Sequence, residues 1–410
     1  MRIRHIAFGL GLGGTERAVQ NFALDTARAG HTIDVVVLTD GPRRSVLVDN
    51  GIEVLVSPGD TSIAQQLAPV DILVIHSHGL DLRFVKSLLQ ASGRPVVGEI
   101  NVFSTPSTWM SEVDTSFQLS PWAHWLYVKR GGDAARSSTL ANPVDVEAFH
   151  FDEQAGETFR ITHEIEPSKV LVGRVGQPLE NKWSPWLVPA LATLMQERAD
   201  VHALLVGAPS EVANQARDRL DPSRLTLLAR LDSDAALRRA YSALDVFAHA
   251  SRQGESFGYV LAEAALTGCP IVTMATPWAD NSQGFVAGPG ARVAITPRGF
   301  TDHLRHAVGD TPKARDARRA DSAGRLHVIE NFSTSAVNTA MIETLAGERP
   351  RVLAPTPSEL SSPVYMGSDH YFANRLLSPW PRNRLRACFA RQESVRWLAS
   401  QEWNRLTGSR

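Results

Sequence analysis

The chain has 410 residues, 43% of them hydrophobic, which is enough for the cores of two domains. Its 42 basic and 43 acidic side chains give a formal net charge of −1, so no global field favours nucleic acid as a partner. Cys269 and Cys388 are too few and too far apart for a disulfide framework, which favours a cytoplasmic location. The basic start lacks the apolar core of a signal peptide, and no run of 18 apolar residues predicts a spanning helix.

Strand-like and helical segments alternate from the first residues onward. A helix is expected over residues 16–29, and a polar connection follows Asn142-Pro143 and continues to Glu166. The strands are expected over residues 3–8, 34–38, 54–56, 71–76 and 95–98. This alternation is typical of a doubly wound parallel sheet and predicts a Rossmann-like domain over residues 1–155.

A second series of the same kind follows the polar connection. A helix is expected over residues 186–197. The strands are expected over residues 170–172, 202–206, 225–228, 245–248, 271–274 and 291–295. We therefore predict a second Rossmann-like domain over residues 166–345, with ligands beyond the carboxyl ends of its strands.

Residues 346–410 differ in composition from both series. A linker rich in proline and serine spans residues 350–363, and from Arg382 onward seven arginines accompany two glutamates. Trp397 and Trp403 lie on a rough helical stripe in this basic segment. The tail either packs back onto the first domain, which we favour, or lies on an anionic membrane surface as a peripheral contact.

Two carboxylates eight positions apart form the most informative motif, Glu255-Ser-Phe-Gly-Tyr-Val-Leu-Ala-Glu263. The motif lies between the strand-like segment 243–250 and a helix that is expected to end at Gly268. Carboxylates accept hydrogen bonds from hydroxyl groups, and the free NH groups at a helix start suit an anion. A nucleotide sugar offers both kinds of group.

Three further motifs occur in a consistent order: Gly13-Gly14-Thr-Glu-Arg17, Asn142-Pro-Val-Asp145, and Gly173-Arg174 followed by Lys182. With the paired glutamates, they resemble the motifs of retaining GT-B glycosyltransferases of the family-4 type, over about residues 1 to 345. The resemblance implies two Rossmann-like domains facing across a cleft, with the acceptor on the first domain and a UDP-, GDP- or other nucleotide-diphosphate sugar on the second. It implies neither a cofactor nor a metal.

The resemblance also implies roles for individual residues. Arg174 and Lys182 stabilise the negative charge that develops on the departing diphosphate. Glu255 binds hydroxyls of the donor sugar, and Glu263 binds the ribose. Backbone groups hold the rest of the donor, at Gly13, Gly14, Phe257, Gly258 and Leu231.

Several positions depart from the family pattern. Where many members have a histidine after a strand, this chain has Glu99-Ile-Asn101, so Asn101 or His78 is a candidate substitute. Trp183 replaces the glycine that usually follows the lysine. His76 and His78 alternate, so both imidazoles are expected to point one way, but with Asp81 they match no common zinc spacing. Arg17, Asp145, Asp280 and Asn281 are weaker candidates for the donor site.

Two alternatives to glycosyl transfer remain open. Gly9-x-Gly11-x-x-Gly14 follows a strand, opens a helix and is followed by Asp40, which satisfies the dinucleotide fingerprint of an NAD-dependent oxidoreductase. A GT-B protein that binds its ligand without turnover is the other alternative. The interpretation we favour is a retaining glycosyltransferase with an unidentified saccharide, glycolipid or small-molecule acceptor.

Overall fold

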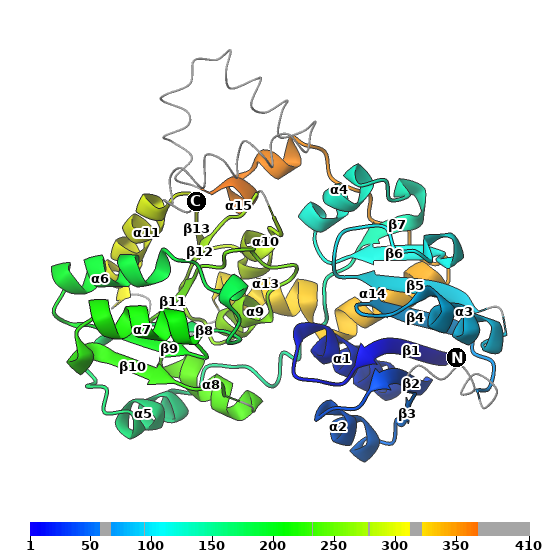
Figure 1. Cartoon of the computed structure of the whole chain (residues 1–410), viewed down its shortest axis with the longest axis horizontal. Coiled ribbons are helices and arrows are strands. Elements are labelled where there is room, and N and C mark those ends of the chain that lie inside the picture. Colours follow the sequence, from blue (N-terminus) through cyan, green and yellow to red (C-terminus); the bar gives the residue numbers. More distant parts are fainter. Residues whose placement is uncertain (58–66, 94, 232, 278, 312–321, 368–410) are drawn as a thin grey trace, which may run out of the picture. The chain divides into compact units, whose positions relative to one another are not determined.

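The computed structural model describes residues 1–57, 67–93, 95–231, 233–277, 279–311 and 322–367 (Figure 1). The described chain forms two compact units. Unit 1 comprises Met1–Glu147, Ser256–Tyr259 and His327–Pro355. Unit 2 comprises Ala148–Glu255, Val260–Leu326 and the described residues from Thr356 onward.

Unit 1 contains a parallel seven-stranded sheet in the order β3-β2-β1-β4-β5-β6-β7. Its strands are β1 (Arg2–Gly9), β2 (Thr32–Thr39), β3 (Glu53–Val56), β4 (Ile72–Ser77), β5 (Val96–Asn101), β6 (Thr115–Gln118) and β7 (Ser137–Thr139). The five strands predicted for this region are confirmed. We did not predict β6 and β7, because these short segments are mostly polar and lack the apolar pattern of the other strands.

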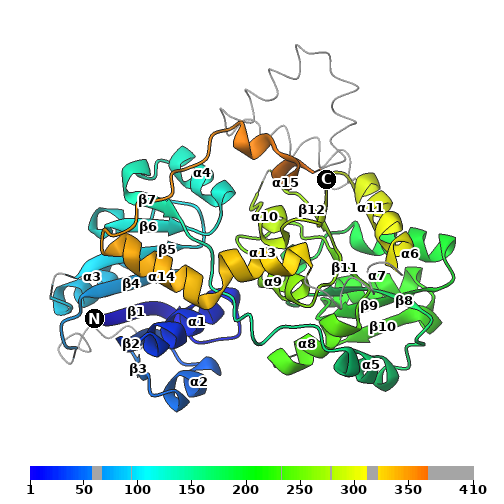
Figure 2. The ribbon, with the colours of Figure 1, turned by 180° about the vertical axis from the view of Figure 1, so that it is seen from behind.

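Helices cover the sheet of unit 1, and Figure 2 shows them from behind. They are α1 (Gly14–Arg28), α2 (Arg43–Asp49), α3 (Leu82–Ala91), α4 (Pro121–Lys129), the end of α13 (Ala323–Phe332) and α14 (Thr334–Leu345). The side chain of Asp81 caps α3 by accepting from the Phe84 amide at 2.9 Å. Thr26 donates to Asn338 at 2.7 Å, which joins α1 to α14.

Unit 2 contains a parallel six-stranded sheet in the order β10-β9-β8-β11-β12-β13. Its strands are β8 (Val170–Val175), β9 (Val201–Val206), β10 (Leu225–Leu228), β11 (Val246–His249), β12 (Ile271–Met274) and β13 (Arg292–Ala294). Its helices are α5 (Glu153–Thr162), α6 (Leu187–Glu197), α7 (Ser210–Arg219), α8 (Asp234–Ala243), α9 (Tyr259–Leu266), α10 (Gln283–Ala287), α11 (Pro297–Gly309) and α15 (Pro363–Met366). All six predicted strands are confirmed.

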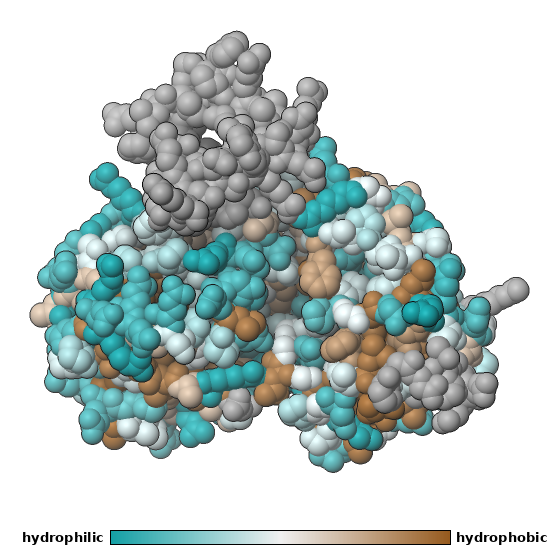
Figure 3. All heavy atoms as spheres, viewed as in Figure 1, coloured by the Kyte–Doolittle hydropathy of each residue, from teal (hydrophilic) through white to brown (hydrophobic). Residues whose placement is uncertain are grey.

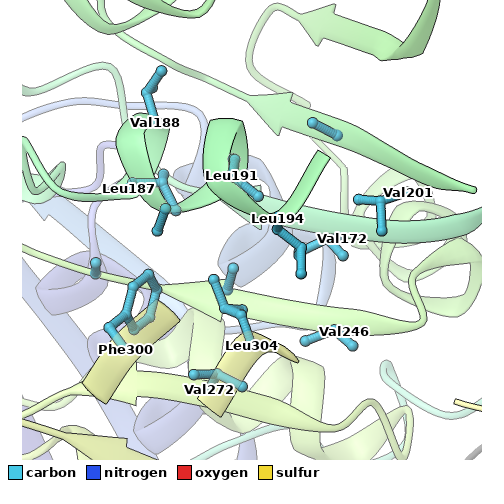
Figure 4. Close-up of a cluster of buried hydrophobic side chains, with 14 of the residues drawn as sticks. Val172, Leu187, Val188, Leu191, Leu194, Val201, Val246, Val272, Phe300 and Leu304 are labelled. Atoms are coloured by element: carbon cyan, nitrogen blue, oxygen red, sulfur yellow. The ribbon is translucent and has the colours of Figure 1, made fainter. Parts of the chain in front are cut away.

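The core of unit 2 lies where α6 and α11 cover the sheet (Figure 4). Leu187, Leu191 and Leu194 come from α6, and Phe300 and Leu304 come from α11. They pack on buried branched side chains of β8, β11 and β12. Burial of each such side chain contributes about 1.5–3 kcal/mol to the stability of the fold. This packing holds the strand ends of unit 2 in fixed positions.

Three segments lie outside the domain in which the sequence places them. Residues 148–155 belong to unit 2, and residues 256–259 and 327–345 belong to unit 1. Residues 346–355 also return to unit 1, where the Val352 amide donates to Ser138 Oγ at 2.8 Å. The predicted basic helix from Arg382 lies outside the described residues. Within the described part, no helix is both long enough and apolar enough to span a membrane.

Candidate active site

The first glutamate of the motif follows β11 after a tight loop. Gly254 has φ +68°, and a Cβ at this position would lie 1.7 Å from the Asp280 carbonyl oxygen. The Glu255 carbonyl accepts from the Ser282 amide at 3.1 Å. Because the loop is this close to Asp280 and Ser282, only glycine fits at 254, and the backbone of Glu255 is held in one place.

Three side chains surround the carboxylate of Glu255, which is buried. Lys182 Nζ lies 2.6 Å from Oε2, and His249 Nε2 lies 3.2 Å from Oε1. The Lys182 side chain is 30% exposed, so it is the member of the cluster that reaches solvent. The Arg174 guanidinium adds a second positive charge nearby. Unit 2 therefore gathers residues from β8, the turn after it, β11 and the motif loop.

The charge state of Glu255 follows from these neighbours. Burial by itself raises the pKa of a carboxyl group. Here Lys182, the hydrogen bond from His249 and the charge of Arg174 outweigh burial and hold the pKa of Glu255 well below its ordinary range. The carboxylate is therefore ionised at neutral pH and accepts hydrogen bonds only.

His249 is a residue of this cluster that we did not predict. Its Nδ1 lies 2.9 Å from Thr273 Oγ1, and burial, with the charge of Arg174, lowers its pKa to about 4. The ring is thus neutral at pH 7, and its single proton serves Glu255 when Thr273 donates to Nδ1. The sequence signal that could have identified His249 is its place at the end of an apolar strand, directly before the motif.

Arg174 is turned into the protein. It is 1% exposed, and its guanidinium lies 5.3 Å from the Trp183 ring and 5.8 Å from the Phe247 ring. Its Nη atoms donate to the carbonyls of Val175 and Lys182, the latter at 3.1 Å. Burial lowers its pKa to about 10, so it remains charged at neutral pH. In this structure Arg174 holds the backbone of the loop that contains Lys182, and the Trp183 ring covers the Arg174 guanidinium.

Glu263 lies in α9 and is also buried. Its Oε2 accepts from the Tyr241 hydroxyl at 2.9 Å. Tyr241 is itself fixed by an edge contact with Phe247, with 5.6 Å between ring centroids. The Glu263 side chain is therefore held in the interior of unit 2 by Tyr241. Its role toward a ribose stays a prediction.

The residues between the two glutamates cluster with unit 1. The Phe257 ring is buried and lies 5.2 Å from Tyr259 and 5.5 Å from Phe332. Gly258 has φ +98°, a conformation that favours glycine directly before α9 begins. The Tyr259 hydroxyl donates to the Pro143 carbonyl at 3.0 Å. The Asn142-Pro-Val-Asp145 segment thus anchors the middle of the motif.

The glycine-rich loop begins α1. Gly13 is the N-cap residue with extended backbone, and Gly14 is the first residue of the helix. A Cβ at Gly13 would lie 2.3 Å from Glu16 Oε2, so the carboxylate of Glu16 lies over the loop. A Cβ at Gly14 would meet the Tyr259 ring at 3.5 Å. Because Glu16 Oε2 is the end of a flexible side chain that can move aside, packing within unit 1 does not by itself require glycine at position 13.

The structure separates His76, which lies in β4, from His78, which follows it. His76 is buried and lies 3.1 Å from His5, whereas His78 is exposed after the strand. The expectation that both imidazoles point one way is therefore wrong, because the chain turns after Ser77, where the His78 amide bonds the His76 carbonyl at 2.8 Å. Asp81 caps α3 instead of joining them. Among the residues that the structure describes, no three histidine, cysteine or acidic side chains form a metal-binding group.

Glu99 and Asn101 lie inside β5, not after it as we expected. Asn101 is buried, and its side chain bonds the backbone of residues 103 to 105. Asn281 is similarly used, between the Thr276 amide and the Tyr365 carbonyl. Leu231 is half-buried beyond the end of β10. The two amide side chains are committed to backbone groups and hold turns in place.

The sequence and the fold match those of glycosyltransferases. Residues 166–310 match the family described as glycosyl transferases group 1. A phosphatidyl-myo-inositol mannosyltransferase of Mycolicibacterium smegmatis is 27% identical over 370 residues, which cover 82% of this chain and 91% of that protein. A mannosyltransferase of the same description from Mycobacterium leprae is 27% identical over 218 residues, or 49% of this chain and 54% of its own length.

Solved structures have the same architecture. Anabaena HepE in complex with UDP and glucose matches with a TM-score of 0.67 and 18% identity, over 84% of this chain and 99% of that chain. A glycosyltransferase from Rickettsia africae matches with a TM-score of 0.69 and 15% identity, over 85% and 98%. These matches favour sugar transfer over the oxidoreductase alternative. The chain therefore has the fold of GT-B glycosyltransferases, and its residues 166–310 match glycosyl transferases group 1.

Proposed function

We propose that this protein transfers a sugar from a nucleotide-diphosphate sugar to an acceptor hydroxyl with retention of the anomeric configuration and without a divalent metal. The ion pair between Lys182 and Glu255 carries the proposal. It places a partly exposed cation and an ionised carboxylate side by side at the carboxyl end of a parallel sheet, where ligands of such sheets bind.

In this proposal, Lys182 acts on the leaving group. The bond between the sugar C1 and the diphosphate oxygen breaks, the electron pair remains on the diphosphate, and positive charge develops on the sugar. The lysine ammonium stabilises the departing oxygens as their charge grows. Arg174 supports it by holding the Lys182 carbonyl and by adding charge from the interior.

Glu255 binds hydroxyls of the donor sugar, because an ionised carboxylate accepts hydrogen bonds only. The acceptor oxygen then bonds to C1 on the face that the diphosphate leaves, and its proton passes to the departing phosphate. No carboxylate serves as a nucleophile. Two glutamates that flank the bond would be needed for the double displacement of glycosidases, whereas Glu263 is bonded to Tyr241 in the interior of unit 2.

A donor panel tests the proposal. The relatives from mycobacteria are named mannosyltransferases and the Anabaena structures contain UDP or UDP-glucose, so GDP-mannose and UDP-glucose are the first donors to compare. A donor at 100 times its dissociation constant stabilises the protein by about 2.7 kcal/mol, which a thermal shift detects. We expect a shift with one donor in the presence of EDTA, and donor hydrolysis or transfer with that donor.

The same panel separates the alternatives. Donor binding without release of nucleoside diphosphate, with any acceptor in a saccharide and glycolipid panel, supports the silent binding protein. Turnover that EDTA abolishes contradicts the metal-independent mechanism. A product whose anomeric configuration, measured by NMR, is opposite to that of the donor contradicts retention.

A further inference from the structure

Three aromatic side chains of unit 1 come together at the surface, beyond the carboxyl ends of three neighbouring strands. Phe8 lies at the end of β1, His78 directly follows β4, and Phe103 follows β5. The centroid of the His78 ring is 6.2 Å from that of Phe8 and 5.4 Å from that of Phe103. We call these three residues the aromatic triad.

The triad is exposed, although it lies beside the core of a parallel sheet. Phe8 is 39% exposed and is the one exposed position of β1, and Phe103 is 53% exposed. On the face shown in Figure 3, most hydrophobic side chains are scattered among hydrophilic ones, with a larger group of them on unit 1. Exposure of two neighbouring phenylalanine side chains to water costs free energy, and such groups of exposed apolar side chains mark binding sites.

The backbone around the triad is built to hold it. Asn101 Oδ1 accepts from the amides of Phe103 and Ser104 at 3.1 and 3.0 Å. Arg130 Nη1 donates to the carbonyls of the same two residues at 2.9 and 3.0 Å. Ser104 has φ +53°, a conformation that non-glycine residues seldom adopt. The loop that presents Phe103 is therefore fixed, at some backbone cost, which is a property of ligand sites.

Phe8 is fixed as well. Gly79 has φ +69°, and a Cβ on it would lie 2.7 Å from the Phe8 ring. Any larger residue at 79 would displace the ring from its place beside His78. Both ends of the triad are therefore held in position before any ligand arrives.

We propose that the aromatic triad is a stacking platform for a pyranose ring of the glycosyl acceptor. The C–H groups on one face of a sugar ring are apolar and weakly positive, and aromatic faces carry negative charge density. The imidazole between the two phenyl rings donates or accepts a hydrogen bond, which suits a ring hydroxyl. An acyl chain would cover the same imidazole without offering it a partner, which costs free energy.

The inference rests on the proposed function for the identity of the ligand as an acceptor. It adds the acceptor's chemical class, a saccharide ring, and the residues that select it. Phe103 and His78 are thus specificity-determining residues and take no part in breaking the donor bond.

Saturation-transfer NMR on the full-length protein tests the platform without any need for turnover. The probes are methyl α-D-mannopyranoside, methyl α-D-glucopyranoside and, as the acyl probe, dihexanoyl phosphatidylcholine. We expect transfer to the ring C–H protons of at least one glycoside, and a decrease of roughly 3- to 10-fold in its affinity for Phe103→Ala. His78→Ala should weaken the same glycoside. Val48→Ala, another exposed apolar residue of unit 1 at the end of α2, should leave it unchanged.

The outcomes are distinct. No transfer to either glycoside, or equal transfer in the wild type and Phe103→Ala, overturns the proposal. Transfer only to the acyl protons, lost in Phe103→Ala, also overturns it and identifies an apolar lipid site. Donor thermal shifts with UDP-glucose and GDP-mannose should be the same in Phe103→Ala and the wild type. If neither donor binds the wild type, the proposed function fails while the glycoside result still decides the platform.

Discussion

The two sheets each carry a buried glutamate near the carboxyl ends of their strands, and the pKa values of the two carboxyl groups are shifted in opposite directions. In unit 1, burial raises the pKa of Glu99, whose partners are neutral donors: Ser116 Oγ at 2.6 Å and Trp109 Nε1 at 3.0 Å. In unit 2, Lys182 and Arg174 overcome burial and hold the pKa of Glu255 well below its ordinary value.

The difference shows that burial by itself does not decide the state of a carboxyl group. Neutral donors offset part of the cost of removing the charge from water, whereas a cation at 2.6 Å more than offsets it. Unit 1 therefore has a carboxyl group that braces a loop, and unit 2 has a permanent carboxylate beside an accessible lysine. Only the second arrangement suits a departing diphosphate.

The largest expected effect is on turnover when the cation of unit 2 is removed. In the proposed mechanism Lys182→Ala deletes the charge that stabilises the departing oxygens, so the turnover number should fall roughly 100- to 1,000-fold, with a smaller change in donor affinity. Steady-state kinetics together with donor calorimetry measure the two effects separately. Lys86→Ala, an exposed lysine near Glu112 in unit 1, is the matched control and should behave as wild type. Near-normal turnover in Lys182→Ala would place the leaving-group role elsewhere.

Glu263 tests whether the second motif glutamate belongs to the same site. If Glu263 accepts hydrogen bonds from the ribose hydroxyls as predicted, Glu263→Ala should weaken binding of the nucleoside diphosphate by about 1–3 kcal/mol in calorimetry. Tyr241→Phe removes only the hydroxyl that donates to Glu263 and serves as the control for a structural role. Equal losses of affinity in both variants, or none in Glu263→Ala, would contradict the ribose assignment.

Glu99→Gln and Glu255→Gln should have opposite dependences on pH. Because the folded pKa of Glu99 is raised, wild-type stability falls as pH rises above the ordinary value of 4.5, and Glu99→Gln removes that loss. Because the folded pKa of Glu255 is depressed, its stabilisation is present above pH 4.5 and is lost only at lower pH.

The melting temperatures of both variants and the wild type between pH 3 and pH 7 provide the measurement. The difference between Glu99→Gln and the wild type should move in favour of the variant as pH rises. Glu255→Gln should be less stable than wild type at pH 7 and should approach it as pH falls. A tenfold change in the acidity of a carboxyl group on folding corresponds to about 1.4 kcal/mol of stability. Parallel pH profiles for the two variants would contradict the comparison.

The smallest effect concerns His249, which orients Glu255. Loss of its hydrogen bond in His249→Leu should raise the activation free energy by roughly 1 kcal/mol, which lowers turnover about fivefold. The donor KM should remain nearly unchanged. His249→Gln retains an amide donor and should recover part of the loss. A merely structural histidine predicts similar kinetics for both variants and a lower melting temperature, so kinetics and melting must be compared.

Most strands were predictable because each is a short run of buried aliphatic residues with polar turns at its ends. The strands β6 and β7 were missed because their polar side chains satisfy one another inside the protein, as when Gln118 donates to Ser116 at 3.0 Å. The boundaries of the two units were also beyond sequence patterns. The chain returns to unit 1 at residue 327, and nothing in the local sequence of α13 marks that point.

The sequence by itself determined the candidate residues for the chemistry, because glycine turns, strand ends and paired glutamates are local patterns. Tertiary structure decided which of them meet. Lys182 and Glu255 are 73 positions apart and are joined only because β8 and β11 are neighbours in the sheet. Arg174 lies inward because Trp183 and Phe247 offer it two ring faces. The aromatic triad exists because β1, β4 and β5 lie side by side, and strand order is set by long-range pairing that no local pattern encodes.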